Sequence, residues 1–223
     1  MNRSFKFSPG EFYHIYSRGV DRRKIYLEKN DYERFCKLLY IANSEKPFEI
    51  SVLEQDKFYS IDRGVQLVDI CAYCLMPNHF HFVIKEHSTN GISLFMKKLL
   101  TGYAMYFNAR NERTGALFQG KFRAKHISTS EYLRHVPLYV HMNSIDLVEP
   151  KWKENGIMDV NKVKKYMRNY PYSSFPDFMG EEREKGRIIS KNSLPAYYDS
   201  LEEHLEDLQD WLEITPEISH LIK

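Results

Sequence analysis

The hydrophobic and polar positions along the chain predict four strands and three helices. Four short segments are rich in β-branched and aromatic residues, which favour strands. In the last two of them apolar and polar residues alternate, as on a half-buried strand. The predicted strands are 12–18, 65–76, 79–85 and 117–127. Apolar residues recur every three or four positions in other segments, which predicts helices over about 30–43, 92–111 and 132–147.

Particular residues are expected to begin or interrupt these helices. Asn30 or Asp31 is a suitable cap for the first helix. Ser128 and Glu131 have the spacing of a capping box before the third helix. Pro137 is expected to kink that helix, because proline removes a backbone donor and crowds the preceding turn.

The order of the predicted elements is strand, helix, strand, strand, helix, strand, helix. A short turn at Pro77-Asn78 makes the second and third strands an antiparallel hairpin. This order predicts an α+β fold with a ferredoxin-like antiparallel sheet (β-α-β-β-α-β), helices on one face and an open opposite face. We expect one domain at 1–178, with the last helix as an addition, and an acidic helical C-terminal extension at 179–223. The extension holds an apolar stripe of Leu201, Leu205, Leu208, Trp211 and Leu212.

Composition narrows the class of protein. The chain has 223 residues, 43% of them hydrophobic, which is enough for a sizeable core. It shows no apolar run near the roughly 20 residues of a membrane span and no signal-peptide core, so we expect a cytoplasmic protein without membrane contact. Cys71 and Cys74 have the CxxC spacing of a metal site. Since no second pair exists, we expect both to be small core residues.

Charge is unevenly distributed although the net charge is only +2. Residues 91–125 hold seven basic residues and one acid, a net of +6, whereas 177–217 hold twelve acids and four bases, a net of −8. The middle of the chain therefore attracts a polyanion. A protected edge strand or a solvated surface would explain the same basic residues. The candidate nucleic-acid contacts are Arg18, Arg22, Arg23, Lys121, Arg123 and Lys125.

Two histidines at the start of the third strand are the first candidate for chemistry. His79 and His81 share one face of a strand, whereas Phe80, Phe82 and Ile84 face the core. Two neighbouring imidazoles offer a divalent metal its first two ligands. The plainer interpretation is a pair of surface histidines on a half-buried strand.

The last predicted helix supplies the second half of the candidate site. His135, Tyr139 and Asn143 are four residues apart and share one helix face. The Asn143 amide oxygen is a neutral ligand that, with two imidazoles, half-fills the shell of Mg²⁺ or Mn²⁺. The Tyr139 phenol is a nucleophile. This set suits phosphoryl transfer on nucleic acid, in which the tyrosine forms a 5′-phosphotyrosine link and releases a 3′-hydroxyl.

These residues resemble those of a known family. The segment 76–81 is similar to the His-hydrophobe-His signature of single-tyrosine HUH transposases, and 139–143 is similar to their nucleophile helix. The likeness is to the insertion-sequence-200-like family, and within it to the REP-associated tyrosine transposases. Further matching segments are 13–19, 117–122 and 170–174.

The resemblance implies a ferredoxin-like palm that binds single-stranded DNA, often beside a hairpin. Its metal ligands correspond to His79, His81 and Asn143, and its nucleophile to Tyr139. Family members often have proline after the asparagine, whereas this chain has Ser144. Insertion-sequence members exchange helices in a homodimer, but REP-associated members look monomeric, and we expect a monomer here.

Two other functions stay open at this point. A catalytically silent, domesticated protein would keep the basic strand and bind single-stranded nucleic acid without cleaving it. A two-histidine metallohydrolase would use water as its nucleophile and needs a carboxylate near the metal. Asp69 and Glu86 are the nearest candidates in the sequence.

Overall fold

The computed structural model describes residues 6–48 and 58–195. Its strands form one antiparallel sheet in the order β2-β3-β1-β4. The strands are β1 (Phe12–Arg18), β2 (Val68–Met76), β3 (His79–Glu86) and β4 (Arg123–Ile127). The helices are α1 (Lys29–Ile41), α2 (Gly91–Arg110), α3 (Ser130–Met142), α4 (Trp152–Asn155), α5 (Val160–Asn169) and α6 (Phe175–Phe178). This order and topology confirm the predicted ferredoxin-like α+β fold.

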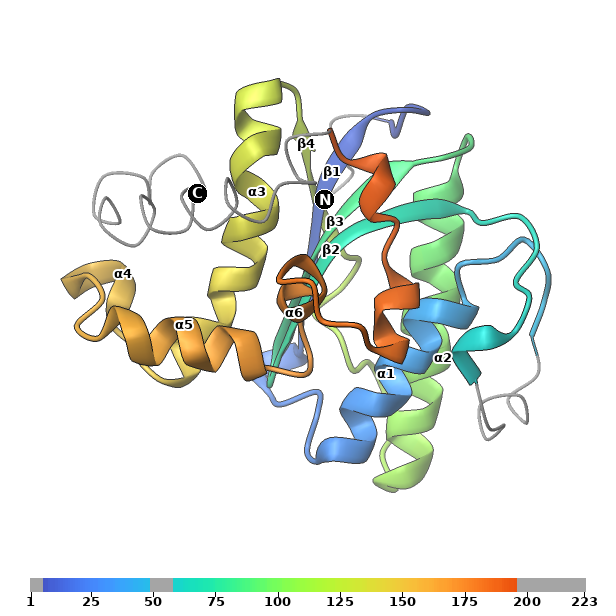
Figure 1. Ribbon diagram of the computed structural model, residues 1–223. Coiled ribbons are helices and arrows are strands. Elements are labelled where there is room, and N and C mark those ends of the chain that lie inside the picture. Colours follow the sequence, from blue (N-terminus) through green and yellow to red (C-terminus); the bar gives the residue numbers. More distant parts are fainter. Residues whose placement is uncertain (1–5, 49–57, 196–223) are drawn as a thin grey trace.

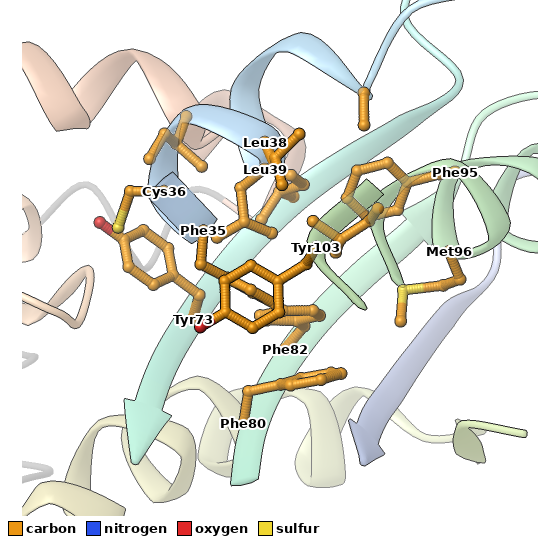
Figure 2. Close-up of a cluster of buried hydrophobic side chains, with 14 of the residues drawn as sticks. Phe35, Cys36, Leu38, Leu39, Tyr73, Phe80, Phe82, Phe95, Met96 and Tyr103 are labelled. Carbon is orange, nitrogen blue, oxygen red and sulfur yellow. The ribbon is translucent and has the colours of Figure 1, made fainter. Parts of the chain in front are cut away.

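Helices cover both faces of the sheet, in two layers (Figure 1). Helices α1 and α2 pack on one face over a buried aromatic cluster that includes Phe35, Phe82 and Tyr103 (Figure 2). Helix α3 packs on the other face, mainly against β2 and β3, over a second cluster that includes Cys74 and Val140. The prediction of an open second face is therefore wrong for the half of the sheet that α3 covers.

The register of the central strands explains which side chains reach each face. Phe80, Phe82 and Ile84 are fully buried in the first cluster, as predicted. His79 and His81 alternate with them and point to the α3 side. Strand β1 lies between β3 and β4, so its residues face the histidines directly.

Element boundaries differ from the predictions in two strands. Strand β2 begins at Val68, three residues later than predicted. Strand β4 begins only at Arg123. The preceding segment holds an isolated bridge between Phe118 and Gly19. Gly120, at φ +70°, then turns the chain in a conformation that other residues rarely adopt.

Both predicted helix caps are wrong in detail. Glu28 caps α1, and the carboxylate of Asp31 accepts a hydrogen bond from the Glu28 backbone. Thr129, rather than Ser128, caps α3 by accepting from the backbone nitrogen of Tyr132 at 3.1 Å. The predicted helix over 132–147 is α3, which runs through Pro137, followed by a 3₁₀ helix over Asn143–Leu147.

The cysteines are buried and unpaired, as expected of core residues. A register shift between Ile70 and Ala72 places a bulge at Cys71. As a result Cys71 and Cys74 both belong to the cluster under α3, although residues three apart on a regular strand would face opposite ways.

The chain after α5 runs along the free edge of β2. The Tyr172 carbonyl accepts from the Leu75 backbone nitrogen at 2.9 Å, and the Ser174 nitrogen donates to the Tyr73 carbonyl at 2.9 Å. Ile188 is buried in the first cluster. The boundary at residue 178 stays a prediction, and the apolar stripe at 201–212 lies outside the described residues. None of the described helices combines the length and the apolar character needed to cross a membrane.

Candidate active site

Three histidines from two neighbouring strands form a contiguous group on the α3 side of the sheet. The ring centroids of His79 and His81 are 5.1 Å apart, and those of His14 and His81 are also 5.1 Å apart. His81 Nδ1 lies 2.8 Å from His14 Nε2, and His79 Nδ1 lies 2.6 Å from Asn78 Oδ1. Each predicted ligand therefore has its Nδ1 in a hydrogen bond and leaves Nε2 for another partner.

Sequence reasoning missed His14. A signal was present, because His14 and Tyr16 alternate with buried residues on β1 and so share one face. The missing information was the register, which pairs His14 with Val83 and Tyr16 with His81. That register is set between strands far apart in the chain.

Helix α3 brings Tyr139 to these histidines. Its ring centroid lies 5.8 Å from that of His14 and 6.1 Å from that of His81, edge-on in both cases. Thr129 fixes the start of this helix, and residues Val136, Leu138 and Val140 anchor it in the core. The structure thus juxtaposes a strand and a distant helix, the arrangement that the sequence predicts.

Asn143 lies one turn beyond Tyr139 and is buried. Its amide nitrogen donates to the carbonyls of Tyr139 at 2.9 Å and Val140 at 3.3 Å. This use of the nitrogen leaves Oδ1 as the acceptor of the side chain. His135, the other predicted residue on this stripe, is half-buried.

Burial governs the protonation of the group. It lowers the pKa of His79 to about 4 and the pKa of His81 well below its ordinary value. Both imidazoles are therefore neutral at pH 7, the form that binds metals. Burial, aided by the negative charge of Asp146, raises the pKa of Tyr139 to about 12, so the phenol is protonated at rest.

An ion pair that the sequence analysis did not identify lies beside Tyr139. Asp146 accepts from Trp152 Nε1 at 2.6 Å and from Lys153 Nζ at 3.3 Å. Lys153 Nζ lies 6.0 Å from the centre of the Tyr139 ring. No local pattern marks these residues, because the 3₁₀ turn after α3 and the following α4 bring them to the site.

A pocket of about 180 Å³ opens beside His79. Its lining includes the predicted DNA contacts Arg18, Lys121 and Arg123, together with Tyr16, Ser17 and Gln119. Arg18 donates to Gln119 at 2.6 Å, which joins β1 to the segment before β4. Three of the six predicted cations thus gather next to a predicted metal ligand.

The other three predicted cations lie around this pocket. Lys125 pairs with His14 across β1 and β4, and its Nζ lies 5.1 Å from the Tyr132 ring centre. Arg22 and Arg23 lie in the loop after β1, where Arg22 ends a short 3₁₀ turn over Val20–Arg22 and Arg23 follows it. That loop contacts the turn before β3, because Asn78 donates to the Arg22 carbonyl at 3.3 Å.

The donor set limits which metal fits. Within 6–48 and 58–195, no cluster of three or more His, Cys, Asp or Glu side chains is arranged to hold a metal ion. Glu86 instead accepts from the Ile92 backbone nitrogen at 2.8 Å, and Asp69 pairs with His87 at 3.7 Å. Both carboxylates lie toward the far end of β3, about 20 Å of strand from His79. Neither carboxylate is therefore placed to share a ligand with His79 and His81.

Part of the chain is similar to a known protein family. Residues 62–143 match the family model described as "Transposase IS200 like". No curated protein matches the chain. A solved structure titled "Structure of the REP associates tyrosine transposase bound to a REP hairpin" aligns with a TM-score of 0.48 and 12% identity, over 83% of this chain and 90% of that one. The family match spans His79, His81, Tyr139 and Asn143, so the segment that carries these residues is similar to IS200-like transposases.

Proposed function

We propose that this protein is a metal-dependent endonuclease and strand transferase that acts on single-stranded DNA through Tyr139. The observation that carries the proposal is the position of the Tyr139 ring, 6.1 Å from His81 by ring centroids, although 58 positions separate the two residues. A purely structural helix has no need to direct a phenol at two neutral imidazoles. The family match over 62–143 supports a transposase reaction.

The protein groups that would hold the metal are His79 Nε2, His81 Nε2 and Asn143 Oδ1. Bound there, Mg²⁺ or Mn²⁺ supplies Lewis-acid polarisation of a DNA phosphate. The neutral state of both imidazoles at pH 7 supports this assignment. The hydrogen bonds at both Nδ1 atoms are compatible with it, because Nε2 is then the nitrogen of each ring that can face a metal.

In the reaction, the Tyr139 oxygen attacks the phosphorus of a backbone phosphate. A Tyr139 O–P bond forms and the P–O3′ bond breaks, so the downstream strand becomes linked to the enzyme through its 5′-phosphate. Tyr139 loses its proton to water during the attack, and the leaving 3′-oxygen takes one up. Attack by another 3′-hydroxyl reverses these steps and rejoins strands without external energy.

The basic pocket would position the DNA. Arg18, Lys121 and Arg123 offer charge-assisted hydrogen bonds to phosphate oxygens next to His79. Arg22, Arg23 and Lys125 would extend the positive surface on either side of the pocket. We propose that the single-stranded DNA is bound together with a DNA hairpin. We propose that a monomer carries out the reaction, because Tyr139 meets the histidines within one chain.

A direct experiment incubates the full chain and Mn²⁺ with a pool of labelled hairpins that carry random single-stranded flanks. The expected result is a protein–DNA adduct that survives a denaturing gel and is lost with EDTA. The matched variant Tyr139→Phe removes only the nucleophilic oxygen and should form no adduct. An equal adduct from Tyr139→Phe, or none from the wild-type protein, would overturn the proposal.

The basic pocket also favours a second candidate, a silent single-stranded nucleic-acid binder, because its cations do not depend on Tyr139. This protein would bind the same pool in EDTA, with strong salt dependence and no cleavage. Binding without any adduct in Mn²⁺ would select this alternative.

A further inference from the structure

We propose that His14 and Asn78 are positioning residues that set the tautomer and the ring orientation of the two metal-binding histidines. The inference rests on the proposed function, since it assumes that His79 and His81 bind the metal through Nε2. It concerns residues outside the predicted ligand set.

The contact of His14 with His81 defines the first half of the pair. His14 is only 4% exposed, and its Nε2 lies 2.8 Å from His81 Nδ1. One of these two nitrogens must donate to the other. When His81 Nδ1 donates, His81 Nε2 keeps its lone pair and can bind a metal. When His14 donates instead, the proton of neutral His81 sits on Nε2 and blocks the metal.

Asn78 sets the tautomer of His79 in the same way, and here only one of the two partners can be the donor. Its Oδ1 lies 2.6 Å from His79 Nδ1, and its Nδ2 donates to the Arg22 carbonyl at 3.3 Å. The contact of Nδ2 with a carbonyl fixes which end of the amide is oxygen. Asn78 Oδ1 accepts only, so His79 Nδ1 must donate and Nε2 keeps its lone pair.

The backbone holds both positioning residues in place. His14 lies in the middle of β1, between β3 and β4. The Asn78 carbonyl accepts from the Gly19 backbone nitrogen at 2.9 Å, which ties the hairpin turn to the loop after β1. The same loop carries Arg22 and Arg23. The orientation of His79 is therefore coupled to the loop that we assign to DNA contact.

The test uses ¹⁵N-histidine NMR of the metal-free full chain and Mn²⁺ titration of the same samples. Wild-type protein should show His79 and His81 protonated on Nδ1. His14→Leu and Asn78→Ala remove the acceptors and should weaken Mn²⁺ binding by roughly 10- to 100-fold. His14→Gln and Asn78→Asp keep an acceptor and should bind Mn²⁺ within a few-fold of wild type.

His126→Leu is the matched control, because His126 lies on the neighbouring strand β4 and pairs with Glu11 rather than with the site. It should leave both readouts unchanged. Wild-type Nε2-protonated rings, or Mn²⁺ binding by His14→Leu and Asn78→Ala equal to wild type, would overturn the inference. If wild type has the expected tautomers, which the two variants lose, but binds no Mn²⁺, the positioning role stands and the proposed metal site fails.

Discussion

At the residue scale, the candidate site depends on imidazoles that stay neutral because they are out of water. Of His14, His79 and His81, His14 has the smallest exposed fraction, 4%. Burial, with the positive charge of Lys125 as the second cause, lowers the pKa of His14 to about 4. A histidine that must remain neutral while the unfolded chain gains a proton makes stability depend on pH.

We predict that His14→Leu flattens the acid side of the stability profile. The folded pKa of His14 is about 4 and its unfolded pKa is about 6.5, so only the unfolded state binds the proton between these values. The contribution of neutral His14 to the free energy of unfolding is full above pH 6.5 and is lost as the pH falls toward 4. Between pH 7 and pH 5, wild type should lose roughly 2 kcal/mol more of its free energy of unfolding than the variant. Urea unfolding at both pH values measures this, and equal losses would contradict it.

The same scale shows which residues of the site are predictable from sequence. A strand has two faces, so alternation alone places His79 and His81 together, and a spacing of four does the same for Tyr139 and Asn143. The contact of His14 with His81 depends on which strands pair and in what register, which local pattern does not contain. Their roles in metal binding and catalysis stay predictions.

At the element scale, the basic pocket is lined by two segments, although the alternation of residues predicts one continuous strand there. Residues 117–127 predict a single strand, but the strand begins at Arg123. The chain turns at Gly120, so its neighbours Gln119 and Lys121 reach the pocket from a loop. Arg123 reaches the pocket from β4. A glycine inside a strand pattern is the sequence signal for such a bend.

We predict that Lys121→Ala and Arg123→Ala each weaken single-stranded DNA binding and reduce its salt dependence. Each removes about one phosphate contact, so the slope of log K against log salt should fall by about 0.7. Fluorescence anisotropy in EDTA at several salt concentrations measures the slope without cleavage. Lys97→Ala is the control, because Lys97 is exposed on α2, on the opposite side of the sheet, and its slope should match wild type. Slopes unchanged in the first two variants would place the DNA elsewhere.

At the scale of the whole molecule, residues 170–195 tie the edge of β2 to both buried clusters. Arg183 donates to the carbonyls of Pro171 and Ser173 and to both oxygens of Asp177. The side chains of Arg183 and Asp177 are 18% and 6% exposed. A change in composition near residue 178 predicts a domain boundary there. The contacts of Arg183 with residues before that position depend on tertiary packing, which composition does not encode.

We predict that Arg183→Met destabilises the fold by about 3 kcal/mol, because it leaves the buried Asp177 carboxylate without its partner. The control is Arg168→Met, which removes an ion pair with Glu181 whose side chains are 60% and 42% exposed. That change should cost less than about 0.5 kcal/mol. Chemical denaturation of both variants measures the difference, and equal stabilities would show that this segment is not anchored as described.

The central claim, that Tyr139 is the nucleophile of a transposase-type strand transfer, is tested most directly by mapping the covalent link. Wild-type protein is incubated with Mn²⁺ and a hairpin substrate labelled at its 3′ end, and the adduct is digested and sequenced by mass spectrometry. The account predicts that the 3′ label travels with the protein, joined through a 5′-phosphate to Tyr139. A link on Tyr16 or Tyr132, the neighbouring phenols, or a label released with no adduct would contradict it.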